Sequence, residues 1–62
     1  YEENRLVLLR AERMYEETLG ARRKKLDKYI TAFEAALKNG DHGEIMDARN
    51  ELNEVLEEED QE

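Results

Sequence analysis

The spacing of the apolar residues constrains this chain most, because it has the period of an α-helix from end to end. Residues three and four apart share one face of a helix, and three segments each carry such a stripe. The first stripe consists of Leu8, Ala11, Tyr15 and Leu19, flanked by Val7, Met14 and Thr18. The second consists of Leu26, Tyr29, Ile30, Phe33, Ala36 and Leu37, and the third of Ile45, Ala48, Leu52, Val55 and Leu56. Three amphipathic helices are predicted, and no strand, because alternation at period two is nowhere sustained.

Glycines and a capping sequence mark where these helices end. Gly20 and Gly40 stand where the residue after a helix commonly takes a positive φ. Asp41 and Glu44 have the spacing of a capping box, in which each side chain accepts a hydrogen bond from the other residue's amide. These signals predict helices over about 2–19, 22–39 and 42–59.

Short connections make consecutive helices antiparallel neighbours. We therefore expect an all-α fold, an antiparallel up-down-up three-helix bundle that forms a single domain over residues 1–62. The alternative is that the first two helices fuse at Gly20 into one rod, since a glycine inside a helix costs only about 1 kcal/mol. The rod would need a second chain to cover its apolar face, and the bundle is favoured.

The charges are unevenly distributed. The 62 residues include 17 acidic and 10 basic ones, for a net charge of −7, and acids concentrate in a tail at 57–62. A basic run occupies 22–25, at the end of the bundle that the tail also reaches, so we expect the two to neutralise each other partly. Exposed ion pairs contribute less than about 1 kcal/mol, which predicts a loosely held tail. Nucleic-acid binding by the basic run is disfavoured by the acidic balance and the lack of an aromatic platform.

Residues for catalysis or metal binding are scarce. Cysteine and serine are absent, and the one histidine, His42, has no nucleophile beside it, which excludes disulfides, thiol chemistry and a serine triad. His42 with Asp41 and Glu44 is better explained by capping than by zinc binding. We expect no enzyme, and no catalytic, cofactor-binding or metal-binding residue. Core packing is expected for Met14, Met46, Tyr15, Tyr29 and Phe33.

An aliphatic run at 6–9 is too short for a membrane span or a signal-peptide core. Its four consecutive residues cover more than one helical face, so some of them must point away from a three-helix core. Such an apolar patch predicts weak self-association of the isolated chain.

Three motifs occur in a recognisable order along the chain. They are 8–13 (LLRAER) before Leu19-Gly20, 33–41 (FEAALKNGD), and Ile45 followed by 51–56 (ELNEVL). This order resembles the C-terminal helical lid of DnaK-type heat-shock chaperones. In that family an A-E-basic stretch precedes a Gly-marked turn, an A-L-x-x-G-D turn follows, and the last helix carries I-x-x-x-x-x-E-L-x-x-x-L. The resemblance covers nearly the whole chain.

The resemblance implies a cytoplasmic, ATP-dependent chaperone that acts in protein folding and the stress response. Its ATPase domain would drive a β-sandwich that holds unfolded client segments, and this lid would close over the sandwich and slow their release. The ATP would belong to the parent protein, and the lid's partners would be the β-sandwich and, indirectly, the client. A start at Tyr1 rather than at methionine fits a piece of a longer protein. The alternative is a stand-alone helical interaction or scaffolding module.

The sequence departs from the family in two respects. The family's lid helix often latches to the sandwich through an Asp and a His one turn apart, and the best register places Leu6 and Arg10 there. No latch residue therefore carries over, which implies a closure that is weaker or differently made. The acidic stretch at 57–60 resembles the E-E-V-D terminus of eukaryotic cytosolic members but lacks its valine, so co-chaperone docking is not implied. A divergent bacterial, HscC-like branch fits better.

Overall fold

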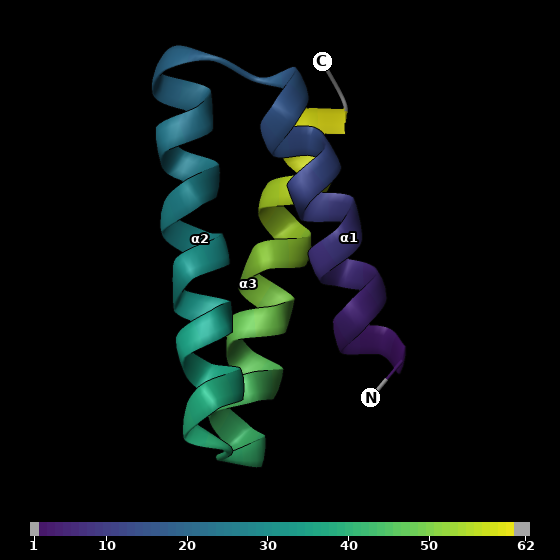
Figure 1. The fold of residues 1–62 in the computed structure, drawn as a ribbon, viewed down its shortest axis with the longest axis vertical. Helices are drawn as coiled ribbons and strands as arrows, with labels where there is room; N and C mark the ends of the chain where they lie inside the picture. Colours follow the sequence, from purple (N-terminus) through teal and green to yellow (C-terminus); the bar gives the residue numbers. More distant parts are fainter. Residues whose placement is uncertain (1, 61–62) are drawn as a thin grey trace.

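The computed structural model describes residues 2–60, which form three α-helices. They are α1 (Glu2–Glu17), α2 (Gly20–Asn39) and α3 (His42–Asp60), and the part of the chain described contains no strand. The helices run up, down and up, with the α1–α2 link at one end and the α2–α3 turn at the other (Figure 1). This confirms the all-α three-helix bundle. Relative to the predicted bounds, α1 ends two residues earlier and α2 begins two residues earlier.

All three helices contribute to one hydrophobic core. Phe33, Leu26, Leu52 and Leu56 are its largest fully buried side chains. Burying a large apolar side chain stabilises a fold by roughly 1.5–3 kcal/mol, so these four supply much of the drive to fold. The buried core cluster consists of Ala11, Met14, Leu26, Ile30, Phe33, Leu52, Val55 and Leu56, with Val7, Leu8, Tyr15, Tyr29, Leu37, Ile45 and Ala48 packed against it.

Two predicted core residues are exposed instead. Leu19 is 77% exposed, because α1 has ended and the backbone at Leu19 is extended, with φ −139° and ψ 163°. Met46 is 49% exposed, because it follows Ile45 by one residue and is turned about 100° around α3. The prediction of core packing is therefore wrong for Leu19 and Met46.

The turn between α2 and α3 closes as a capped joint. Gly40 has φ +81°, as predicted, and its N–H donates to the Ala36 carbonyl at 3.0 Å. The Asp41 carboxylate accepts from the Glu44 amide at 2.9 Å, which is one half of the predicted capping box. The other half is wrong, because the Glu44 carboxylate accepts from the Asn39 side-chain amide at 2.9 Å.

The link between α1 and α2 is only Thr18 and Leu19. Thr18 bonds back to the Tyr15 carbonyl through its amide at 3.4 Å and its hydroxyl at 3.3 Å. Gly20 has the predicted positive φ, at +64°, but it begins α2 instead of following α1 directly. Leu19 stands at the N-cap of α2 and supplies no side-chain hydrogen bond to it.

The three helices are not equally embedded. Most of the contact between helices is made by α2 with α3, and α1 packs less extensively against either of them. In the view of Figure 1, α1 lies beside α3, inclined to it, and passes in front of its C-terminal part. Within residues 2–60, no helix is both long and apolar enough to cross a membrane.

Candidate functional site

The outward face of α1 is the most distinctive surface of the bundle. Leu6 and Leu9 are 53% and 52% exposed, whereas Val7 and Leu8 are half-buried against the core. This confirms that part of the aliphatic run points away from the core. Two leucines of one helix, one turn apart and both facing water, form an apolar patch, and such a patch is a place where another protein surface can pack.

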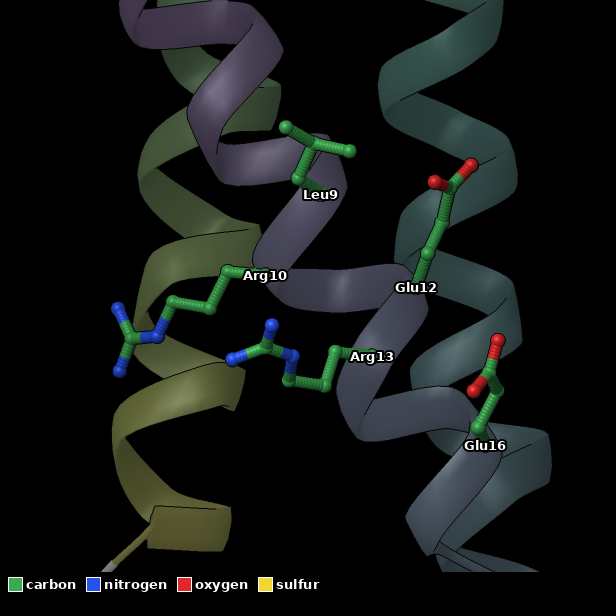
Figure 2. A pocket seen from close by; sticks show the side chains of 5 residues that line it. All are labelled: Leu9, Arg10, Glu12, Arg13 and Glu16. Carbon is green, nitrogen blue, oxygen red and sulfur yellow. The ribbon is translucent and has the colours of Figure 1, made fainter.

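Opposite charges border this patch on its two sides. Figure 2 shows Arg10 and Arg13 directed toward the C-terminal end of α3, and Glu12 and Glu16 on the side of α2, with Leu9 between the pairs. These five side chains line one shallow hollow on α1. We call this surface, made of Leu6, Leu9, Arg10, Glu12, Arg13 and Glu16, the α1 face. Its apolar centre and mixed-charge rim are typical of a helix that packs against protein.

Acidic residues at the end of α3 pair with bases of α1 and α2. Glu59 lies 2.5 Å from Arg22 Nε, and Glu58 lies 3.6 Å from Lys25 Nζ. The predicted neutralisation of the basic run is therefore confirmed for these residues. Residues 57–60 also continue α3 rather than forming a loose tail, and Gln61 and Glu62 lie outside the described residues.

Arg10 of α1 also pairs with the acidic end of α3, a contact that no sequence pattern predicted. Its guanidinium lies 2.5 Å from the Asp60 carboxylate, which joins α1 to the end of α3. Both side chains are about half exposed, so the pair contributes less than about 1 kcal/mol. Arg10, Arg22 and Lys25 thus each lie within 4 Å of a carboxylate at this end of the bundle.

Two further contacts of α1 were also missed. Asn4 is 6% exposed, and its side-chain oxygen accepts a hydrogen bond from Arg49 of α3 at 2.9 Å. The Arg23 guanidinium lies 4.3 Å from the centre of the Tyr15 ring, and its Nε donates to the Tyr15 carbonyl at 3.1 Å. Only the spacing hinted at the first contact, because Asn4 stands seven residues before Ala11 on the buried stripe.

Between residues 2 and 60, no three side chains of the types that bind metals come together to hold an ion. His42 is exposed at the first residue of α3. The expectation that the chain carries no catalytic or cofactor-binding residue stays a prediction.

Comparisons with known proteins do not add a relative. No protein-family model matches the chain, and neither the curated proteins nor the solved structures contain a match. The fold therefore rests on the structure described above. The similarity to the chaperone lid rests on the order of the three sequence motifs alone.

Proposed function

We propose that this chain is the C-terminal lid subdomain of a DnaK-type, ATP-dependent chaperone. In that role it would help to retain unfolded client segments on a neighbouring β-sandwich, without catalysis of its own. The observation that carries the proposal is the α1 face, where Leu6 and Leu9 stay exposed on a bundle whose core is already complete. The order of the three lid-like sequence motifs is the reason for proposing the DnaK-type family.

The exposed leucines need an explanation outside the bundle. Phe33, Leu26 and their neighbours fill the core without Leu6 or Leu9. Each leucine still leaves about half of its surface in water, and burying that surface against a partner would contribute roughly 25 cal/mol per Å². In a chaperone of this family, the partner would be the β-sandwich or the preceding part of the lid.

The same face suggests how such a lid would close. Leu6 and Arg10 occupy the positions of the family's latch, and Arg10 is already paired with Asp60. An ion-pair latch is therefore replaced by apolar contact through Leu6 and its neighbour Leu9. Closure of this kind would depend little on salt, because apolar burial is not screened by ions.

The first experiment measures the native protein that contains this segment. An antibody raised against these 62 residues is used to blot a lysate of the source cells, followed by a pull-down on ATP-agarose. We expect a band several-fold larger than 7.4 kDa that ATP-agarose retains. A band at 7.4 kDa would overturn the lid and leave the stand-alone helical module, which the mixed-charge rim of the α1 face also suits.

The second experiment tests the α1 face within that parent protein. Leu6→Ser and Leu9→Ser are combined, and the release of a fluorescent client peptide is followed by anisotropy. We expect release to be several-fold faster, because the closed lid has lost its apolar contact. Met46→Ser is the matched control, since Met46 is similarly exposed but lies on α3. Equal release rates for the double variant and the control would refute the proposed role of the face.

A further inference from the structure

The α1–α2 link combines three features that favour a second arrangement of the chain. It is only two residues long, its N-cap residue Leu19 makes no side-chain hydrogen bond, and Gly20 holds a φ of +64°. The link and its place at one end of the bundle are visible in Figure 1. A short hinge between two helices is a known starting point for exchange of a helix between copies.

Leu19, in this link, is a large apolar residue that the bundle leaves exposed to water. At 77% it is the most exposed of the large apolar residues in the described chain. It follows Tyr15 by four residues and precedes Leu26 by seven. If α1 and α2 ran on as one continuous helix, these three residues would therefore share one face. The apolar stripe interrupted at the link would become continuous.

The contact between α1 and α2 in the bundle indicates how the continuous helices of two copies would pack against each other. In the bundle the Tyr15 ring packs under Arg23, and these residues lie four positions before and four positions after Leu19. Two continuous helices that paired antiparallel through the same contact would cross at Leu19. The Leu19 side chains of the two copies would then face each other across the two-fold axis.

We propose that this chain forms a domain-swapped dimer with a second copy of itself. Residues 2–39 become one helix in each copy, and α1 of each copy takes the place of α1 on the partner's α2–α3 pair. The contacts of α1 in the bundle are made again between copies, including Tyr15 with Arg23, Asn4 with Arg49, and Arg10 with Asp60. The dimer gains a buried pair of Leu19 side chains and helical hydrogen bonds at the former link.

The α2–α3 turn does not offer the same exchange. Its Asp41 side chain caps α3 at 2.9 Å, and the Gly40 amide bonds back to α2 at 3.0 Å. The α1–α2 link has only the longer bonds from Thr18 to the Tyr15 carbonyl, at 3.3 and 3.4 Å, so opening it costs less. The contact between α2 and α3 is also the most extensive in the bundle. The exchange is therefore confined to α1, and it does not depend on the proposed chaperone role.

The first test substitutes a residue of the α1–α2 link so that the link favours a continuous helix over the bend seen in the bundle. Gly20→Ala disfavours the bundle, because alanine rarely adopts φ +64°, and it favours the continuous helix. Alanine is roughly fivefold better than glycine inside a helix, so two joints should strengthen dimerisation at least about 25-fold. Sedimentation velocity over a concentration series measures this. Gly40→Ala is the control, since it strains a positive-φ glycine at the capped turn but keeps the α1–α2 link, and it should leave the dimerisation constant at the wild-type value.

The second test distinguishes a swapped dimer from one that associates through the α1 face. Arg5→Cys and Glu34→Cys place spin labels on exposed positions of a chain without native cysteine. The labelled chain is refolded with a tenfold excess of unlabelled chain, so that electron-electron dipolar measurements report distances within one copy. The longest extent of the bundle is 31 Å, whereas one continuous helix separates residues 29 positions apart by about 44 Å.

The distance is measured in the wild-type background at high concentration and in the Gly20→Ala background. If the dimer is swapped, its two labels at positions 5 and 34 of one copy should be about 44 Å apart in both backgrounds. Dimers that show only the short distance would refute the exchange and indicate association through the α1 face. A clean monomer at millimolar concentration in both backgrounds would also overturn the proposal. The wild-type sample decides the result if Gly20→Ala does not fold.

The third test addresses the two-fold axis. Leu19→Lys would remove the buried leucine pair and place two positive charges opposite each other in the dimer, which should weaken dimerisation at least about tenfold. The monomer loses little, because Leu19 already faces water. Leu9→Lys is the matched control, because it adds the same charge to the α1 face. Weaker dimerisation with Leu9→Lys but not with Leu19→Lys would contradict the swapped arrangement.

Discussion

The α2–α3 pair and α1 are held in this molecule by different means. The pair is joined by a capped turn and buries the largest side chains of the core, with Phe33 and Leu26 from α2 and Leu52 and Leu56 from α3. The buried residues of α1 include none of these largest fully buried side chains. They are Ala11, Met14 and Asn4.

Besides its apolar contacts with the core, α1 is attached to the pair by polar contacts near both of its ends. Arg49 holds Asn4 at one end of the helix, and Arg23 holds Tyr15 at the other. Polar contacts at a partly exposed surface contribute less than the burial of large apolar side chains. The comparison indicates that α2 and α3 form the stable part of the bundle, and that α1 opens at a lower free energy.

The largest loss of stability is expected from a substitution at the centre of the α2–α3 pair. Phe33→Ala removes a fully buried ring and is expected to destabilise the fold by about 3–5 kcal/mol, enough to unfold a domain of this size. Circular dichroism should show loss of most helical signal. Thr31→Ala, at an exposed position of the same helix, is the control. Unchanged helicity in the Phe33 variant would mean that the pair does not form the centre of the core.

The next largest loss of stability is expected from a substitution that loosens α1 but not α2 or α3. Asn4→Ala removes one of two partners of Arg49, whose side chain is only 20% exposed and which keeps its ion pair with Glu3 at 3.2 Å. Because the lost hydrogen bond comes from a charged group, the change is expected to cost about 1–3 kcal/mol. Hydrogen exchange should become faster at amides of α1 and change less in α2 and α3. Asn50→Ala, an exposed asparagine on α3, is the matched control. Equal acceleration in all three helices would show that α1 does not open separately.

A smaller effect should follow from uncapping α3. Asp41→Ala removes the acceptor for the Glu44 amide, and loss of such a cap costs about 1 kcal/mol. Thermal unfolding should shift by several degrees, with the first turn of α3 losing exchange protection. The control is Asp47→Ala, which removes the same charge from an exposed position inside the helix. If both variants unfold at the same temperature, net charge rather than capping explains the change.

The smallest effect should come from the charged end of the bundle. Arg22→Ala breaks the pair with Glu59 and is expected to cost less than about 1 kcal/mol at low salt, and less still in 1 M salt. Urea unfolding at the two salt concentrations measures the difference. Lys24→Ala removes the same charge from an exposed neighbour and serves as the control. A salt-independent loss would show that the Arg22 side chain acts through packing.

The three-helix fold was predictable because its signals are local. The stripe over Leu26, Ile30 and Phe33 repeats at helical spacing, and a glycine marks each break between helices. It was also predictable that the basic run at 22–25 lies close to the acidic residues at 58–59, because an up-down-up order brings both segments to the same end of the bundle.

The candidate site was only partly predictable. The aliphatic run at 6–9 had to expose some residues, but the rotation of α1 against its neighbours selected Leu6 and Leu9. That rotation depends on side chains distant in sequence. Arg49, for example, reaches Asn4 from 45 positions away, and no local pattern encodes such a contact.

The sequence by itself determined that the chain forms three amphipathic helices with breaks near Gly20 and Gly40, because helix periodicity and turn chemistry act between near neighbours. Only the tertiary structure decided that Leu19 and Met46 lie in water and that Asn4 is buried. The physical reason is that burial depends on how far each helix extends and how it is rotated when all three pack together. Both are settled by the whole core at once.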